Sequence, residues 1–172
     1  MGTIYTIGHS NRTIADFIAM LHSFGIKVLA DIRSMPGSRK WPQFNQSALN
    51  VSLHEAGIKY IHMPGLGGRR KAKPDSVNTA WHNKSFMGYA DYMETPEFKG
   101  AIKELEDIAR NEPTVYMCAE ALWWRCHRSL VSDYLKVQGW NVLHIMNMGK
   151  STPHAYTAPA RPVQGDLFYN EP

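Results

Sequence analysis

Five short runs of β-branched, aromatic and other apolar residues punctuate this chain. They cover residues 3–7, 26–32, 58–63, 113–118 and 140–145. Runs of this length and composition are typical of β-strands, and a helical pattern lies between each one and the next. Strands separated by single helices need crossover connections, which produce a mostly parallel sheet. We therefore predict an α/β fold: a single three-layer domain with a mostly parallel sheet of about five strands and helices on both faces.

Helix start and stop signals agree with this order. The strongest is Thr95-Pro96-Glu97, which places a proline at the first helical position. Thr13 and Asp16 form a capping signature for the helix after the first strand, and Asn45 or Ser47 can cap the helix after the second. Glycines that suit helix ends close three predicted helices: Gly25, Gly57 and Gly139.

A length of 172 residues with 44% apolar composition suits one globular domain. No apolar run approaches the roughly 18 to 20 residues of a membrane helix, and the N-terminus lacks the basic start of a secretion signal. We expect a cytoplasmic protein without a membrane partner. Residues 1–148 are predicted to build the α/β domain. Residues 149–172, with four prolines and no helical period, are predicted to form an extended C-terminal tail, lying on the domain or free in solvent.

Polar residues gather where the predicted strands end. In an open parallel sheet, ligands bind beyond the carboxyl ends of the strands, because loops and helix N-termini converge there. The first strand delivers His9 and Ser10, the second Asp31 and Arg33, and the fourth Cys118. Asp31 beside Arg33 is also compatible with a purely structural ion pair. We predict a site at this edge of the sheet.

The segment from Pro64 to Lys84 is rich in glycine, basic and polar residues, which indicates a long, mobile surface loop. Within it, Gly65-Leu66-Gly67-Gly68-Arg69 could wrap a phosphate with backbone amides and close it with the arginine, as mobile lids do. The spacing fits neither the P-loop nor the dinucleotide-binding fingerprint. Arg69 is therefore a candidate phosphate-binding residue.

The segment from Cys118 to Ser129 lies between a predicted strand and a predicted helix, where enzymes lower the pKa of a catalytic cysteine. Rhodanese and cysteine phosphatase loops have this arrangement. In the phosphatase pattern five residues separate cysteine from arginine, whereas six separate Cys118 from Arg125. Glu120 would also raise the pKa of the thiol. We interpret Cys118 as a structural strand-end cysteine at the substrate site, and a nucleophilic Cys118 stays the alternative.

Glu120 and Arg128 are the other candidates in this segment. Glu120 suits general acid or base chemistry, and a solvated loop glutamate is its structural alternative. Arg128, in the first turn of the helix, would supply positive charge to a phosphate or to Glu120. Cys118 with Cys126 and His127 has a spacing that matches no common zinc pattern. We expect neither a metal nor another cofactor, and two cysteines provide no disulfide framework.

The formal charge of +4 favours polyanionic partners such as nucleic acid or a phosphorylated small molecule. Four tryptophans lie in loops or at loop edges beside cationic residues: Trp41, Trp81, Trp123 and Trp124. This mixture suits the stacking of bases between aromatic rings, and packing of the rings onto the domain is the alternative.

The tail segment Gln164-Gly165-Asp166-Leu167-Phe168 is similar to the short motif by which bacterial replication and repair proteins dock on the sliding clamp. Linear motifs of this kind work in flexible tails. The sliding clamp is therefore a candidate partner, bound through Gln164, Leu167 and Phe168. Packing of Leu167 and Phe168 on the domain's own surface is the alternative.

Taken together, these segments resemble the prokaryotic family catalogued as domain of unknown function 488 (DUF488), over nearly the whole chain. The segments that carry the resemblance are residues 6–12, 31–36, 57–60, 66–69, 118–120 and 126–128. The resemblance implies a compact α/β domain whose motifs cluster at one end of the sheet. It implies no particular reaction, because the activity of the family is unassigned.

Our leading hypothesis is an enzyme that acts on nucleic acid or a nucleotide-like phosphorylated substrate by hydrolase- or lyase-type chemistry. In this scheme His9 and Glu120 handle protons and Asp31 orients His9 or Arg33. The residues that bind substrate or phosphate are Ser10, Arg33, Arg69, Cys118 and Arg128. Two alternatives stay open: a rhodanese-like sulfurtransferase or thiol hydrolase that uses Cys118, and a non-catalytic nucleic-acid adaptor that docks on the sliding clamp.

Overall fold

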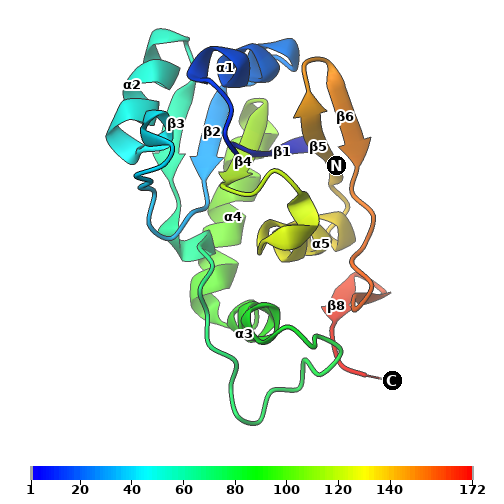
Figure 1. The fold of residues 1–172 in the computed structure, drawn as a ribbon. Coiled ribbons are helices and arrows are strands. Elements are labelled where there is room, and N and C mark those ends of the chain that lie inside the picture. The colour runs from blue at the N-terminus through cyan, green and yellow to red at the C-terminus, as the bar shows by residue number, and fades with distance from the viewer. Residues whose placement is uncertain (1, 172) are drawn as a thin grey trace.

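The computed structural model describes residues 2–171 and contains a six-stranded sheet in the order β3-β2-β4-β1-β5-β6. The first five strands of this order run parallel, and β6 is antiparallel to β5 (Figure 1). The strands of this sheet are β1 (Thr3–Gly8), β2 (Val28–Asp31), β3 (Lys59–His62), β4 (Thr114–Cys118), β5 (Asn141–Asn147) and β6 (Lys150–Pro153). The predicted mostly parallel α/β sheet is confirmed, with β6 as an additional strand.

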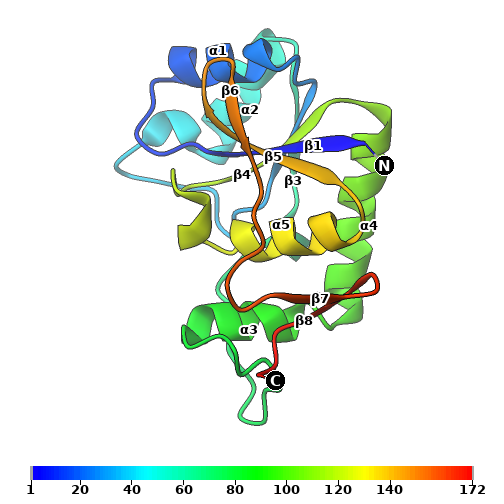
Figure 2. The same ribbon diagram turned by 90° about the vertical axis from the view of Figure 1, so that its right-hand side faces the viewer.

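Helices cover both faces of the sheet. On one face lie α1 (Ile14–Ser23) and α2 (Gln46–Glu55), and on the other lie α4 (Pro96–Asn111) and α5 (Arg128–Val137), with α3 (Lys84–Tyr92) farther out (Figure 2). Alternate residues of a strand point to opposite faces, so β1 sends Ile4 into the core under α4 and α5 and Ile7 into the core under α1 and α2. The three-layer prediction is therefore confirmed.

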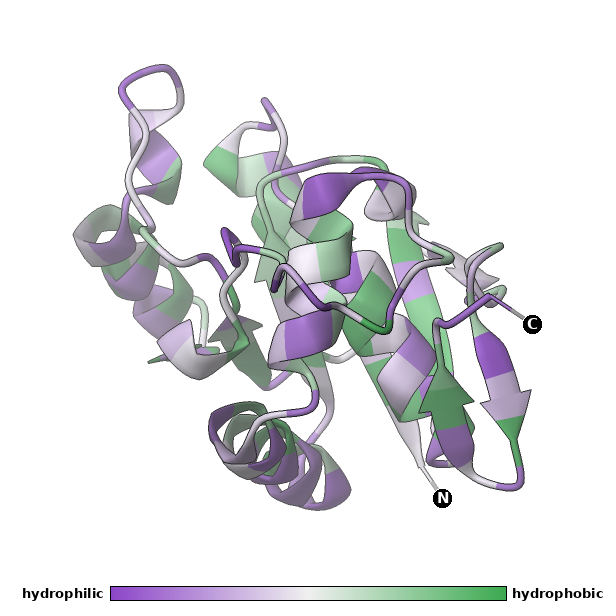
Figure 3. Cartoon of the chain, turned by 90° about the horizontal axis from the view of Figure 1, so that it is seen from below, coloured by the Kyte–Doolittle hydropathy of each residue, from purple (hydrophilic) through white to green (hydrophobic). Residues whose placement is uncertain are grey.

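The predicted helix starts depend on local hydrogen bonds that the structure contains. Thr13 Oγ1 accepts the backbone N–H of Asp16 at 3.1 Å, and Thr95 Oγ1 accepts that of Phe98 at 3.3 Å. These bonds satisfy N–H groups that have no partner within the helix. In Figure 3 the strands carry both green and purple stretches, since β2 and β4 are buried throughout whereas the edge strands β3 and β6 are partly exposed.

The long segment that follows β3 is attached to α3, an element that the sequence analysis did not identify. Asp91 on α3 accepts hydrogen bonds from the backbone N–H of Lys73, the hydroxyl of Ser76 and the amide of Asn78. Gly88 also lets the segment approach closely, because a Cβ atom there would lie 2.1 Å from the carbonyl oxygen of Arg70. A glycine inside a short polar helix weakens the helical pattern, which explains why the sequence analysis missed α3.

Residues 149–171 lie on the domain. After β6, the strands β7 (Arg161–Val163) and β8 (Asp166–Phe168) form an antiparallel hairpin. Its two turn residues, Gln164 and Gly165, have φ angles of 50° and 86°, as a two-residue turn with both residues left-handed requires. Tyr169 is 4% exposed and belongs to the core. The C-terminal segment is therefore packed against the fold that it follows.

The segment that resembles a clamp-docking motif forms the turn and second strand of this hairpin. Leu167 packs against the core, and Phe168 is 42% exposed with the Arg161 guanidinium 5.1 Å from its ring centre. A peptide that docks in an extended form would have to leave the hairpin first. Docking on the sliding clamp stays a prediction.

No helix within residues 2–171 combines the length and the apolar composition needed to cross a membrane.

We expect Tyr169→Ala to lower the free energy of unfolding by about 3 kcal/mol or more, because it removes a buried ring and the hydroxyl that donates to Asp133. The neighbouring Phe168→Ala should change it by less than about 1 kcal/mol, because that ring is partly exposed. Chemical denaturation of both variants measures the difference. A loss of less than about 1 kcal/mol for Tyr169→Ala would show that the C-terminal segment does not stabilise the domain.

Candidate functional site

A cleft opens where β1 and β4 end. These strands are neighbours, but β1 leads to α1 on one face of the sheet and β4 leads to α5 on the other. Diverging connections of this kind leave a crevice at the carboxyl ends of parallel strands. The cleft has a volume of about 670 Å³, within the range of small-molecule sites. Its walls come from the segments that follow β1, β2, η2 (Pro64–Leu66) and β4.

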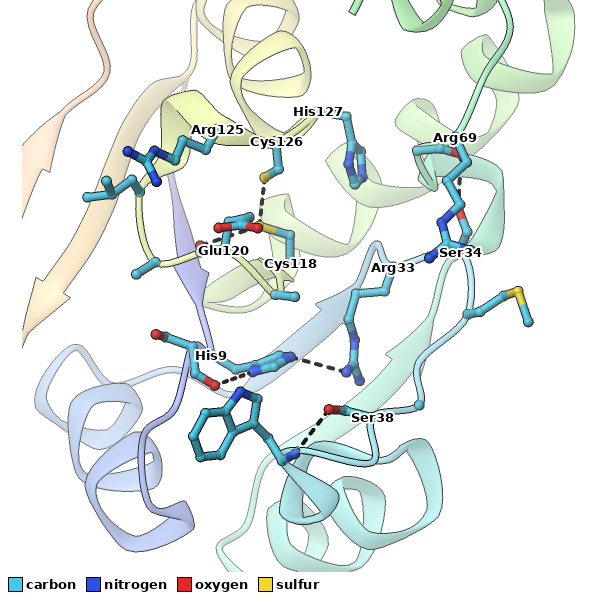
Figure 4. A pocket seen from close by; sticks show the side chains of 18 of the residues that line it. His9, Arg33, Ser34, Ser38, Arg69, Cys118, Glu120, Arg125, Cys126 and His127 are labelled. Atoms are coloured by element: carbon cyan, nitrogen blue, oxygen red, sulfur yellow. Dashed lines mark hydrogen bonds between the residues drawn. The ribbon is translucent and has the colours of Figure 1, made fainter. Parts of the chain in front are cut away.

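The structure brings most of the predicted residues to this cleft. His9, Ser10, Arg33, Arg69, Cys118 and Glu120 line it. Figure 4 shows Cys118 and Glu120 on one side, with His9 and Arg33 facing them across the cavity. Asp31 and Arg128 do not line it but contact residues that do. The lining residues that sequence reasoning did not assign to the site include Arg125, Cys126 and His127, although all three lie in the segment between β4 and α5 that it singled out.

Gly8 allows the two strand ends to meet. A Cβ atom at this position would lie 1.7 Å from the carbonyl oxygen of Glu120, a distance that no side chain tolerates. The ladder between β1 and β4 therefore continues past the strands, with the N–H of His9 bonded to the carbonyl of Cys118 at 3.0 Å. The N–H of Ser10 follows with the carbonyl of Ala119 at 2.9 Å.

One wall of the cleft is held by a buried ion pair. Arg33 donates from Nε and Nη2 to the two oxygens of Asp31, at 2.9 and 2.7 Å. Asp31 also accepts the hydroxyl of Tyr60 at 2.6 Å, and Arg33 donates to the carbonyl of Phe44 at 2.8 Å. Burial and the hydrogen bond to Asp31 raise the pKa of Tyr60. A fully hydrogen-bonded pair of this geometry is rigid, so the guanidinium has a fixed position at the cleft.

His9 reaches the same guanidinium from the other side. Its Nδ1 lies 2.8 Å from the carbonyl oxygen of Ser10 and must donate, because a carbonyl only accepts. This leaves Nε2 to accept from Arg33 Nη1 at 3.3 Å, and the ring stacks on Phe44. Burial lowers the pKa of His9 to about 4, so the ring is neutral near pH 7. Asp31 therefore contacts Arg33 rather than His9, and His9 is a neutral partner of the arginine.

The opposite wall carries the two cysteines of the chain. Both are free, and their Sγ atoms lie 2.7 Å apart in a hydrogen bond. Burial raises the pKa of Cys118, but the hydrogen bond from Cys126 and the charge of Arg128 outweigh it and lower the pKa to about 7. Burial and the neighbouring Cys118 raise the pKa of Cys126. Where the sequence analysis expected Glu120 to raise the pKa of Cys118, Glu120 is exposed and Arg128 has the larger effect.

Arg128 is 1% exposed and lies behind the cysteines. Its Nη2 donates to the carbonyl oxygens of Glu120 and Ala121, at 2.9 and 3.4 Å, rather than to the Glu120 carboxylate. Its Nη1 donates to Thr6 Oγ1 at 2.8 Å. Its Nε is buried without an oxygen or nitrogen partner among residues 2–171. The guanidinium therefore supports the loop that follows β4 and keeps its charge beside the sulfur atoms.

A buried chain of hydrogen bonds fixes Arg128 from behind. Thr6 Oγ1 bonds His144 Nδ1 at 2.6 Å, His144 Nε2 bonds His154 Nδ1 at 2.8 Å, and His154 Nε2 bonds Asp133 at 2.8 Å. Arg128 only donates, and an ionised Asp133 only accepts. Burial and the neighbouring His154 lower the pKa of His144, so this ring is neutral near pH 7. The chain fixes the position of Thr6, whose hydroxyl accepts from Arg128.

Trp123 ties this chain to the loop after β4. Its ring stacks on His144 with ring centres 4.6 Å apart and planes 3° from parallel. Trp124 beside it is 50% exposed, and Trp41 lines the cleft. Trp81 instead packs in the core against Phe86. This is the alternative in which the ring packs onto the domain and stacks on no base. The four tryptophans therefore lie in different environments.

Three charged side chains at the cleft are exposed: Arg69, Glu120 and Arg125. Within residues 2–171, none of these side chains forms an ion pair. His127 is half-buried and carries no charge near pH 7. Its Nε2 donates to the carbonyl of Ile32, and burial lowers its pKa to about 4. No group of three or more potential metal-binding side chains occurs in the described part of the chain.

We expect Thr6→Val to raise the pKa of Cys118 above about 7, because Arg128 loses the acceptor that orients its Nη1. Thr6→Ser keeps the hydroxyl and should keep the pKa. The pH dependence of Cys118 alkylation, read by peptide mass spectrometry, measures both. Trypsin cleaves after Arg125 and so separates the two cysteines. A folded Thr6→Val protein with an unchanged pKa would show that the buried chain does not position Arg128.

Comparison with known proteins identifies the family to which the chain belongs. No curated protein and no solved structure matches the chain. The model of the family described as domain of unknown function DUF488 matches residues 13–135. This match covers most of the chain, including Asp31 and Arg33 on one wall of the cleft and Cys118 and Arg128 on the other. The protein therefore belongs to the DUF488 family.

Proposed function

We propose that this protein is an enzyme in which the Cys118 thiolate attacks a phosphorylated, nucleotide-like substrate. The observation that carries the proposal is the position of Cys118 in the cleft, hydrogen-bonded by Cys126 and backed by the buried charge of Arg128. With a pKa of about 7, roughly half of the thiol is ionised at pH 7, against a few per cent for an ordinary cysteine. The thiolate is the reactive form.

The charge of the cleft supports an anionic substrate. Arg69 and Arg125 are exposed at its edge without ion-pair partners in the described chain, whereas Arg33 lines the cleft in an ion pair with Asp31. Arginine binds phosphate oxygens through several N–H groups at once. Trp41 and Met35 also line the cleft and offer apolar surface to a base or another flat group.

The reaction that fits these groups is a substitution by sulfur. The Cys118 thiolate forms a bond to an electrophilic atom of the substrate, and the leaving group departs with the electron pair of the broken bond. The leaving group takes up a proton from solvent, and Glu120 is a carboxylate exposed at the cleft that can relay it. Water or a second acceptor then releases the group held on sulfur, as in a thiol hydrolase or a sulfurtransferase. His9 has both ring nitrogens engaged and serves this scheme by holding Arg33.

Alkylation by iodoacetamide tests the nucleophile. We expect the rate at Cys118 to rise with pH around a midpoint near 7 and then to level off, because only the thiolate reacts. Free cysteine, with a pKa near 8.5, is the reference. A midpoint at or above that of free cysteine would refute the proposed nucleophile.

Phosphate recognition is tested by protection of Cys118. Inorganic phosphate and mononucleotides should slow alkylation in the wild-type protein, and much less in Arg69→Ala. Lys71→Ala is the matched control, because Lys71 is an exposed cation of the same segment that does not line the cleft. Equal protection in all three proteins would remove Arg69 from the site. Nucleic-acid binding that falls steeply with salt and persists in Cys118→Ser, without turnover of any phosphorylated compound, would favour the non-catalytic adaptor.

A further inference from the structure

Cys126 forms no covalent bond in the substitution just described, where its thiol only donates a hydrogen bond to the nucleophile. The two sulfur atoms, 2.7 Å apart, belong to the only cysteines of the chain. Cys118 ends β4, and Cys126 lies two residues before Arg128, the first residue of α5. A single loop of seven residues joins them. Each sulfur lies within reach of the other without any change in the fold.

The two thiols have different chemical characters. Arg128 and the hydrogen bond from Cys126 favour the ionised form of Cys118. Cys126 keeps its proton, because burial and the negative charge on Cys118 disfavour a second thiolate. Among the other titratable groups around the pair, burial raises the pKa values of Tyr89 and Tyr116 and lowers that of His127, so these three stay neutral near pH 7. The pair thus consists of one nucleophile and one protonated partner in contact with it.

We propose that Cys118 and Cys126 form a redox-active dithiol that performs thiol–disulfide exchange, with Cys118 as the attacking cysteine and Cys126 as the resolving cysteine. This activity rests on the nucleophile of the proposed function, but not on its phosphorylated substrate. Its substrate is a small disulfide that fits the cleft and carries negative charge, because Arg69 and Arg125 stand exposed at the entrance.

The exchange balances in two steps. The Cys118 thiolate attacks one sulfur of the substrate disulfide, forms a mixed disulfide, and releases the other half as a thiolate. Cys126 then loses its proton to that thiolate or to solvent, attacks the sulfur of Cys118, and releases the second half. In total, two protein thiols are oxidised to one disulfide and one substrate disulfide is reduced to two thiols. A low-molecular-weight thiol drives the reverse reaction and restores the dithiol.

Arg128 influences the direction of this exchange. Its charge stabilises the thiolate, which exists only in the reduced protein. A stabilised reduced form makes a dithiol pair a stronger oxidant. We therefore expect the disulfide form to be reduced readily by low-molecular-weight thiols, unlike a buried structural disulfide.

Incubation of the full chain with oxidised glutathione tests the proposal. The wild-type protein should lose the mass of two hydrogen atoms, and its tryptic peptides containing Cys118 and Cys126 should become linked. Cys126→Ser should instead retain one glutathionyl group on Cys118, because no second thiol is present to release it. Reduced glutathione in excess should reverse both products. The wild-type mass needs no variant and therefore does not depend on the folding of one.

Two results would overturn the inference. One is a wild-type protein that reacts but keeps glutathione on Cys118, which would show that Cys126 does not resolve. The other is a Cys118→Ser protein that is glutathionylated at Cys126 as fast as Cys126→Ser is at Cys118, which would refute the order of attack. Alkylation separates this failure from that of the proposed function. A Cys118 that alkylates with a midpoint near pH 7 but forms no disulfide removes the dithiol activity alone, whereas an unreactive Cys118 removes both.

Discussion

The site depends on the interaction between the buried guanidinium of Arg128 and the thiol of Cys118. Burying a charge costs several kcal/mol unless hydrogen bonds and an opposite charge compensate for it. Its Nη atoms bond Thr6 and two loop carbonyls, but these partners are neutral, and Asp133 lies at the far end of the hydrogen-bonded chain. Among the groups beside it that can become anions, Cys118 has the largest effect on the pKa of Arg128. Ionisation of this thiol supplies a counter-charge to Arg128, and the hydrogen bond from Cys126 and the charge of Arg128 together lower the pKa of Cys118.

The two walls of the cleft are built differently. On one, Asp31, Phe44 and His9 bond the guanidinium of Arg33 and Tyr60 bonds Asp31, so the guanidinium has a fixed orientation. On the other, the loop after β4 is held by the carbonyl contacts of Arg128 and by the stacking of Trp123. The two free thiols thus lie on the wall that leads into α5, while the facing wall holds Arg33 in an ion pair with Asp31. The exposed side chains of Arg69 and Arg125 lie at the edge of the cleft and belong to neither the Arg33 nor the Arg128 hydrogen-bond network.

The C-terminal segment contributes to the site from a distance. His154 and Tyr169 both bond Asp133, so the segment after β6 closes the chain of hydrogen bonds that ends at Arg128. Loss of these contacts would leave a carboxylate buried without partners, which is costly. The segment is therefore a structural part of the domain, in addition to any docking that its hairpin performs.

The sequence by itself determined the succession of the first five strands and of most helices along the chain, because apolar periodicity and capping bonds such as Thr13 with Asp16 are local. It also indicated His9, Arg33 and Cys118 as neighbours, since parallel strands end at one edge of a sheet. It left α3 and the hairpin undetected, because Gly88 and the polar tail carry weak local patterns. Only the tertiary structure decided that Cys118 meets Cys126 and that Asp133 reaches Arg128 through His154 and His144. Those contacts depend on the order of the strands and the path of a loop, which join residues whose spacing along the chain contains no periodic signal.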